Sequence, residues 1–242
     1  MKPDTPTTLA LEFSSRSGSI ALMNNSGESL VAPTTVGRNV EDDVFPSIEK
    51  TATALDISAN ELELVIVSVG PGGFTGLRTA VTIAKMISFV SGATIVPIES
   101  AIVCVQQADK GDGPFAVISS VKGDEFWLSN IVLKESLWVC TSKTSSTKEL
   151  QQDAKHAAGV FVDSFLPVEA REIMKQHGIP IYTSTPDANA LLQAGLEYYK
   201  EGKSIEPELL LPIYPRDPEA VRVWNAKKTR KPQKPPIRNR DR

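Results

Sequence analysis

Histidine and cysteine are scarce in this chain of 242 residues, which has two of each. Cys104 and Cys140 lack C-x-x-C spacing, and the only histidines are His156 and His177. These numbers exclude a disulfide framework and a Cys/His zinc site. They also leave no His, Cys or metal constellation that could activate a nucleophile, so a protease activity has no support.

Long apolar runs are absent as well. No run of eighteen apolar residues occurs, and the first residues, MKPDTPTTLALEF, are polar where a signal peptide needs an apolar segment. We therefore expect a cytoplasmic protein with no membrane partner. The length and the apolar content of 41% suffice for one large domain or two small ones.

Charge is unevenly distributed along the chain. The formal net charge is −3, yet residues 226–242, AKKTRKPQKPPIRNRDR, carry eight Lys or Arg against Asp241. Three prolines and the lack of an aliphatic pattern predict a disordered basic tail. Such a tail can add affinity for RNA by counterion release, or it can simply solubilise the protein.

Strand patterns come first in the chain, and strands alternating with helices follow. Residues 8–13, 17–23 and about 29–36 predict strands, and 40–56 predict a helix that Pro46 interrupts. Further strands are expected at 62–69, 94–98, 115–121, 126–133, 137–141, 159–164 and 179–183, and helices at 75–90, 167–177 and 187–200, with a polar segment at 142–159. This order predicts an α/β fold with mixed sheets.

The most distinctive segment is GPGGFTGLR, which follows the apolar run at 62–69. It lacks the lysine of a Walker loop and the spacing of a dinucleotide fingerprint. The favoured interpretation is a tight turn and a helix start, with the free amides of the first turn left open as an anion site. The residues of this structural glycine loop are Gly70, Gly72, Gly73, Thr75 and Gly76.

The helix that follows the glycine loop is apolar around most of its circumference. Thr75, Arg78, Thr79, Thr82 and Lys85 share one arc, and apolar side chains fill nearly all the rest. Such a helix is either buried deep in its own domain or covers a second face with another chain. The periodicity does not decide between the two.

The segment GPGGFTGLRTAVTIAKMISF resembles the signature of the bacterial TsaB family, also called YeaZ, which is close to GPGSFTGLR followed by an apolar helix. LALEFSSRSGSIAL, KGDEFWLSNI and LPIYPR resemble further pieces in the family's order. The sequence departs from the family at Glu12, which is usually Asp, at 119–121 and at Pro215. These departures put in doubt any remaining ligand contact of the cleft.

The resemblance implies an actin-like ATPase fold, which is ribonuclease H-like, with two related mixed-sheet α/β halves. We place these halves at 1–100 and 101–225, before the tail at 226–242. The resemblance further implies that the protein is a non-catalytic scaffold subunit that binds and activates a catalytic paralogue, TsaD. That enzyme transfers a threonylcarbamoyl group to the adenosine beside the anticodon of tRNA. The resemblance also implies a further partner, the ATPase TsaE, and contact with tRNA through the complex of these proteins.

The catalytic paralogue holds metal through an HxxxH pair on its first long helix, and GRNVEDDVFPSIEK contains no histidine. We therefore expect no cofactor on this chain alone, with ATP and a divalent metal in the partner subunits. The resemblance also leaves open whether the isolated chain pairs with itself. The predicted partner surface comprises Phe45, Ile48 and Ala52 on one helix and Arg78, Val81, Thr82 and Lys85 on the other.

The alternative is an ATP-binding phosphotransferase or ATPase of the actin/sugar-kinase superfamily. Glu12, Ser14 and Ser15 would then lie near phosphate, because a carboxylate can hold a magnesium-bound water and hydroxyls can meet phosphate oxygens. Against this alternative, two-half kinases need longer chains than 242 residues.

Overall fold

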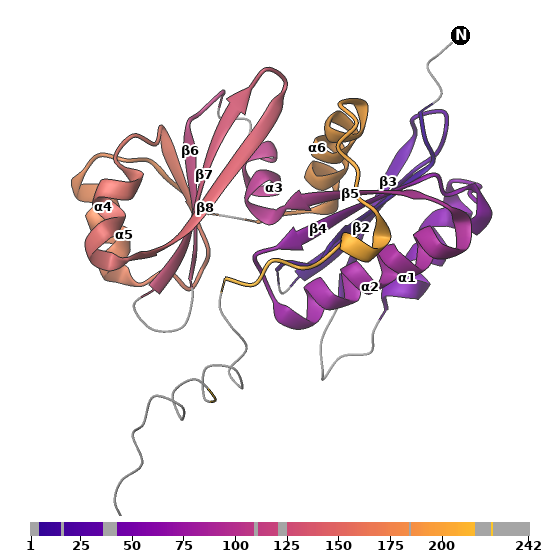
Figure 1. Cartoon of the computed structure of the whole chain (residues 1–242), viewed down its shortest axis with the longest axis horizontal. Helices are drawn as coiled ribbons and strands as arrows, with labels where there is room; N and C mark the ends of the chain where they lie inside the picture. Colours follow the sequence, from indigo (N-terminus) through magenta and orange to yellow (C-terminus); the bar gives the residue numbers. More distant parts are fainter. Residues whose placement is uncertain are drawn as a thin grey trace, which may run out of the picture.

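The structure is a computed structural model that describes residues 5–15, 17–35, 43–108, 111–120, 125–183, 185–215 and 224. The predicted basic tail at 226–242 lies outside these residues. The described chain forms two five-stranded mixed sheets that lie side by side, each with its own helices (Figure 1).

The first sheet has the strand order β3-β2-β1-β4-β5. β1 pairs antiparallel with β2 and parallel with β4, so that Thr8 lies opposite both Met23 and Leu64. Every residue of β4 is buried, as the unbroken apolar run predicts for a strand covered on both faces. The strands are β1 (Thr8–Glu12), β2 (Ser17–Met23), β3 (Ser29–Thr35), β4 (Leu64–Gly70) and β5 (Thr94–Glu99).

The second sheet has the order β10-β9-β6-β7-β8. β6 pairs antiparallel with β7 and parallel with β9, and β7 and β8 form a long antiparallel pair. The strands are β6 (Phe115–Ser120), β7 (Glu125–Lys134), β8 (Leu137–Ser146), β9 (Gly159–Val162) and β10 (Ile181–Thr183).

The two sheets repeat one topology. In each sheet, three antiparallel strands in chain order are followed by a helix, a parallel strand, a second helix and another parallel strand. The helices after the third and fourth strands are α1 (Val44–Ala54) and α2 (Phe74–Ser91) in the first half, and α4 (Thr147–Ala154) and α5 (Val168–Gln176) in the second. The predicted fold of two related mixed-sheet halves is confirmed.

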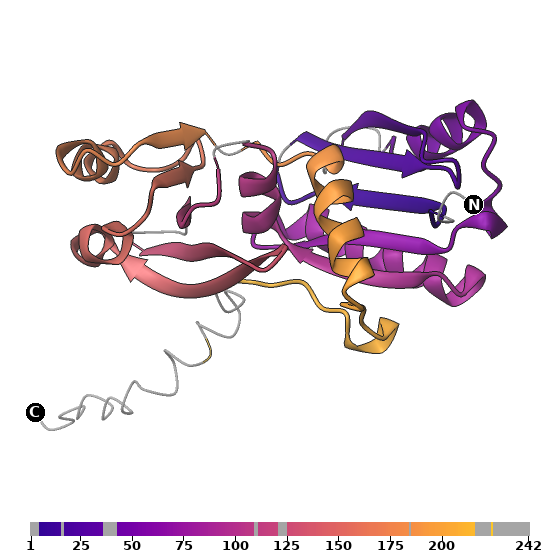
Figure 2. The same cartoon turned by 90° about the horizontal axis from the view of Figure 1, so that it is seen from above.

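Each half ends in a further helix, α3 (Ser100–Gln106) or α6 (Ala188–Lys200). α1 and α2 cover one face of the first sheet, while α3 and α6 pack on its other face and against each other (Figure 2). α3 also contacts β6, β7 and β8. One cluster of buried side chains therefore runs from the first sheet through α3 to Phe115 and Phe161 of the second.

The division of the chain predicted at residue 100 assigns residues 101–225 to the second half, but the segment from α6 onward packs on the first half. α6 follows the second sheet in sequence, yet its sheet contacts are mainly with β1, β2, β4 and β5. After α6, Ile205 bridges to Ile95 of β5, and the short helix η2 (Pro207–Leu209) contacts α2. Residues 188–213 thus complete the first half, because one face of its sheet would otherwise be covered by α3 alone and the edge at β5 would be open.

Three local expectations differ from the structure. Pro46 does not interrupt a helix, because α1 begins at Val44 and its first-turn N–H groups have no helical partner to lose. α3 was not expected, since SAIVCVQ is apolar on all sides. β8 extends to Ser146, beyond the predicted 137–141.

Ser58 and Glu61 form a capping box that begins the short helix η1 (Ala59–Glu61). None of the described helices combines the length and apolar character needed to cross a membrane.

Candidate functional site

The glycine loop joins β4 to α2 and packs against the turn between β1 and β2. A Cβ atom at Gly72 would lie 2.3 Å from the carbonyl oxygen of Ser14, and one at Gly76 would lie 2.2 Å from that of Phe13. Neither position can hold a side chain without moving backbone. Gly70 adopts a φ of 100°, which favours glycine. Gly72 and Gly76 are therefore required for the approach of two backbone segments, and Gly70 is required for the turn.

The start of α2 is set by backbone contacts. Gly73 is the residue before the first turn, and its N–H donates to the carbonyl oxygen of Ser14 at 2.8 Å. No side chain caps this helix, and Thr75 lies within the first turn instead of preceding it. The prediction that these glycines form a turn and place a helix agrees with this geometry.

Glu12 is the last residue of β1 and lies two residues before Ser14 in the chain. Its side chain is fully buried, and its Oε1 accepts hydrogen bonds from the backbone N–H of Ser14, at 2.8 Å, and from the Ser14 hydroxyl. Burial raises the pKa of Glu12, and the hydrogen bonds from Ser14 offset only part of this rise. Glu12 is thus a buried acid whose neutral form is favoured.

A cleft of about 800 Å³ lies between the two halves. The glycine loop forms one wall, with Ser14 and Ser15 beside it, while Glu12 does not line the cleft. Among the described lining residues there is no Lys, Arg or His. The lining residues are Ser14, Ser15, Pro71, Gly72, Gly73, Phe74, Thr75, Gly76, Ser100, Ala101, Cys104, Val117, Ser119, Ser120, Asp163, Ser164, Phe165, Thr183, Thr185, Pro186, Tyr214 and Pro215.

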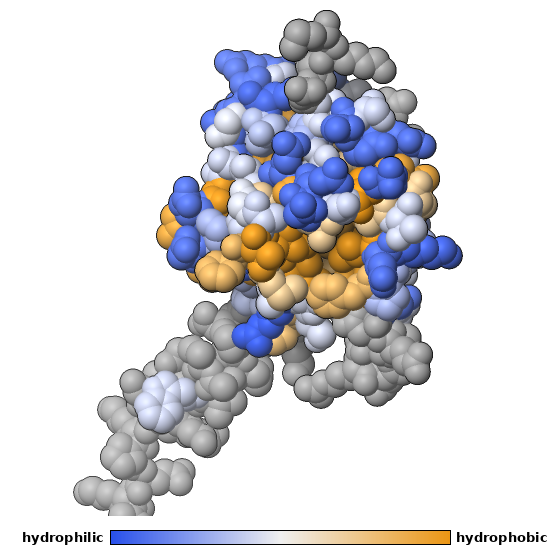
Figure 3. Space-filling view, turned by 90° about the vertical axis from the view of Figure 1, so that its right-hand side faces the viewer, coloured by the Kyte–Doolittle hydropathy of each residue, from blue (hydrophilic) through white to orange (hydrophobic). Residues whose placement is uncertain are grey.

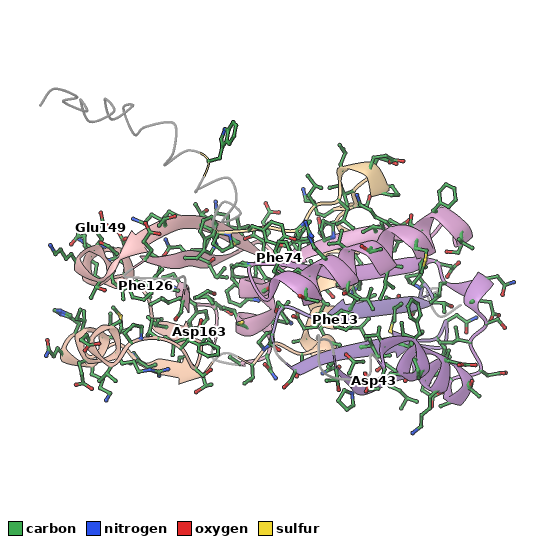
Figure 4. All side chains as sticks on the ribbon, turned by 90° about the horizontal axis from the view of Figure 1, so that it is seen from below. Phe13, Asp43, Phe74, Phe126, Glu149 and Asp163 are labelled. Carbon is green, nitrogen blue, oxygen red and sulfur yellow. The ribbon has the colours of Figure 1, made fainter. Side chains whose placement is uncertain are left out.

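The second half contributes residues that the sequence did not single out. Asp163 follows β9 and accepts hydrogen bonds from the N–H and hydroxyl of Ser120, at 2.7 and 2.8 Å, and from the N–H of Phe165 at 2.9 Å. Figure 4 shows Asp163 on the second half and Phe74 at the end of α2 that faces it. The positions after β6 and β9 adjoin because the two strands are parallel neighbours.

Aromatic side chains join α2 to the end of the described chain. The rings of Phe74 and Tyr214 lie 5.0 Å apart, and the guanidinium carbon of Arg78 lies 4.1 Å from the centroid of the Phe74 ring. The Phe74 ring therefore contacts both a tyrosine and a cation. The sequence pattern did not predict this contact, because Tyr214 is 140 residues from its partner.

The predicted partner residues are not all on the surface. Phe45 of α1 is exposed, while Ile48 and Ala52 are half-buried and pack against the core beneath the helix. On α2, Arg78 and Thr82 are exposed and Lys85 is half-buried.

Val81 has only 6% of its surface exposed and belongs to the core under α2. Its predicted exposure is wrong, because Leu77, Val81 and Ala84 lie on the face that covers the sheet.

α2 keeps an apolar surface outside this core. Met86, Phe89 and Val90 are exposed near its end, with 90% of Phe89 accessible. Figure 3 views the molecule from the end where α2 finishes, and apolar residues gather there in a band between hydrophilic ones. The apolar side chains of α2 thus form a buried face along the helix and an exposed patch near its end.

Comparisons with known proteins find similar sequences. Residues 20–135 match a family model described as TsaD, tRNA N6-adenosine threonylcarbamoyltransferase. The chain is also 25% identical, over 128 residues, to the tRNA threonylcarbamoyladenosine biosynthesis protein TsaB of Haemophilus influenzae. This alignment covers 52% of the chain and 54% of that relative, so it spans about half the length of the curated protein.

Two solved structures from Pseudomonas aeruginosa share the fold. YeaZ superimposes with a TM-score of 0.69 at 19% identity, covering 87% of this chain and all of that one. A protein described as similar to peptidase YEAZ gives 0.70 at 20% identity, covering 88% and 100%. The chain is therefore similar to proteins of the TsaB/YeaZ family and shares their fold. The glycine segment that indicated this family is the loop that places α2.

Among the described residues there is no group of three or more His, Cys, Asp or Glu that could hold a metal ion. The two features that the geometry singles out are the cleft and the exposed side of α1 and α2.

Proposed function

We propose that this chain is a non-catalytic scaffold subunit in the biosynthesis of threonylcarbamoyladenosine in tRNA. It binds and activates a catalytic paralogue of the TsaD type, and TsaE and tRNA take part through the assembled complex. The relative in Haemophilus influenzae, whose name assigns it to this biosynthesis, supports the pathway. The absence of the HxxxH pair from GRNVEDDVFPSIEK supports the lack of a catalytic role.

The observation that carries the proposal is the exposed apolar patch near the end of α2. The buried face of the helix covers the sheet, and Met86, Phe89 and Val90 remain exposed on its other side. Large exposed apolar side chains that gather on one surface are typical of sites that bind another protein. Phe45, Arg78, Thr82 and Lys85 extend this surface along α1 and α2, and Val81 supports it from below.

The catalytic paralogue is the partner that we propose for this surface. Two helices from each protein would pack together, burying aliphatic and aromatic side chains at helical spacing. Exposed aromatic residues at the centre of such an interface contribute most of the binding energy. Phe89 is the residue from which we expect the largest effect.

Two measurements test this proposal. The first is binding of the purified catalytic paralogue to the full chain by calorimetry, and the second is tRNA modification with and without the chain. We expect Phe89→Asp to weaken binding by 30-fold or more, since about 2 kcal/mol or more is usual for a central aromatic residue. Folding should remain unchanged, because Phe89 is exposed.

Lys175→Asp on α5 is the matched control, because this residue is exposed on the second half. It should bind the paralogue as the unchanged chain does. Equal binding by Phe89→Asp, or tRNA modification at full rate without this chain, would contradict the proposal.

A further inference from the structure

Glu12 is the one acidic side chain at the turn between β1 and β2 for which the sequence suggests a ligand contact. The alternative function requires it to face the cleft and to hold a magnesium-bound water. Its side chain is instead fully buried, and it is not among the residues that line the cleft. Ser14, which does line the cleft, lies between them and donates two hydrogen bonds to Oε1.

The second oxygen of Glu12, Oε2, has no hydrogen-bond partner among the described residues. Its neighbourhood disfavours charge: burial raises the pKa of this carboxyl, and the negative charge of Asp187 adds to the rise. Divalent cations need ionised or carbonyl oxygens that they can reach. The ATP and cation implied by an actin-like fold therefore do not fit this carboxyl.

The contacts of Ser14 show what the buried carboxyl does instead. Its carbonyl oxygen accepts the N–H of Gly73 at 2.8 Å and touches the space where a side chain at Gly72 would stand. Glu12 fixes Ser14 through both its N–H and its hydroxyl, and Ser14 in turn fixes the residue that precedes the first turn of α2. A continuous chain of hydrogen bonds thus runs from the buried acid to the helix.

We propose that Glu12 is a positioning residue that acts through Ser14 to fix the beginning of α2, and that it takes no part in binding a metal or nucleotide. Its importance for a partner rests on the proposed function, since α2 carries the exposed apolar face. The positioning itself is a property of the isolated chain and is tested on that chain.

Three variants of the full chain separate a positioning role from a cation-binding one. Glu12→Gln keeps an oxygen that can accept both hydrogen bonds of Ser14 but cannot be ionised. Ser14→Ala removes the hydroxyl donor, and Glu12→Ala removes the acceptor. Glu125→Ala is the control, because this carboxylate is exposed at the start of β7.

Hydrogen exchange of the backbone amides gives the first readout. In Glu12→Ala and Ser14→Ala we expect the amides of Gly73 and Leu77, which bond to Ser14 and Gly73, to exchange at least tenfold faster. Amides of β9 should keep their rates, Glu12→Gln should exchange no faster than the unchanged chain, and the control should match it. Uniformly faster exchange throughout Ser14→Ala, or fast exchange at Gly73 in Glu12→Gln, overturns the positioning role.

Titration with magnesium and ATP gives the second readout. We expect no saturable heat of binding from the unchanged chain or from Glu12→Gln. Binding by the unchanged chain that Glu12→Gln abolishes would overturn the proposal, because only a ligand role depends on the negative charge. Neither readout involves the catalytic paralogue, so failure of the proposed scaffold function would leave both results interpretable.

Discussion

Substitution of Gly76 by alanine has two opposite effects on stability, a gain in helix propensity and a steric clash with backbone. In the interior of a helix, alanine is favoured over glycine by about 1 kcal/mol. At this position, however, the added Cβ would lie 2.2 Å from the carbonyl oxygen of Phe13 and 3.2 Å from its carbonyl carbon. Both are backbone atoms of the β1–β2 turn, which Ser14 and Gly73 hold in place.

Overpacking of a well-packed site usually costs about 1–3 kcal/mol, and a contact with fixed backbone belongs at the upper end. Subtracting the gain in helix propensity leaves a net loss of about 2 kcal/mol in the free energy of unfolding. For a chain of this length, that loss lowers the melting temperature by about 4–8 °C.

Urea unfolding followed by circular dichroism, together with thermal melting, measures this loss. Gly73→Ser is the matched control, because a Cβ there would lie 3.8 Å from the nearest atom. Serine before the first helical turn can also cap it, so this variant should equal or exceed the unchanged chain. If Gly76→Ala is as stable as the unchanged chain, the turn can move away and the glycines are not required for close approach.

Three further predictions concern other parts of the molecule. Val81→Glu should lower the free energy of unfolding by about 3 kcal/mol or more, because it buries an unpaired carboxylate. Thr82→Glu on the exposed face should change the free energy of unfolding by about 0.5 kcal/mol or less. Urea unfolding measures both changes, and equal losses would refute the assignment of faces. Because burial raises the pKa of Glu12, the contribution of this carboxyl to stability is fully present below its unfolded-state pKa of about 4.3 and is lost as pH rises through its folded-state pKa. The stability of Glu12→Gln relative to the unchanged chain should therefore increase with pH. Unfolding experiments at several pH values measure this difference, and a constant difference would contradict the raised pKa. Truncation after Trp224 should leave the melting temperature unchanged and reduce the salt dependence of tRNA binding by the assembled complex, and a large loss of thermal stability would mean that the tail packs on the protein.

Much of the local structure could be predicted from the sequence. The hairpin at the start, the capping box at Ser58 and the buried strand β4 follow from turn residues, spacing and an unbroken apolar run. The glycine loop was also predicted as a helix start. These features depend on interactions between residues close in sequence, which is why patterns revealed them.

The long-range arrangement could not be predicted in the same way. The amphipathic pattern of 187–200 predicts a helix, but it does not say which sheet the helix covers. The cleft combines Ser14, Ser120, Asp163 and Tyr214 from four distant segments. The burial of Glu12 and of Val81 depends on which face of each element meets the core, and several faces were equally apolar.

The return of α6 and residues 205–213 to the first sheet bears on how the protein is made. Synthesis proceeds from the N-terminus, and domains generally fold as they emerge. Here α6, the bridge of Ile205 to Ile95 and the buried Leu210 all belong to the first half but are made after the whole second half. The earlier strands must therefore wait, with one apolar face covered by α3 alone and one edge open to solvent, until almost the entire described chain has left the ribosome.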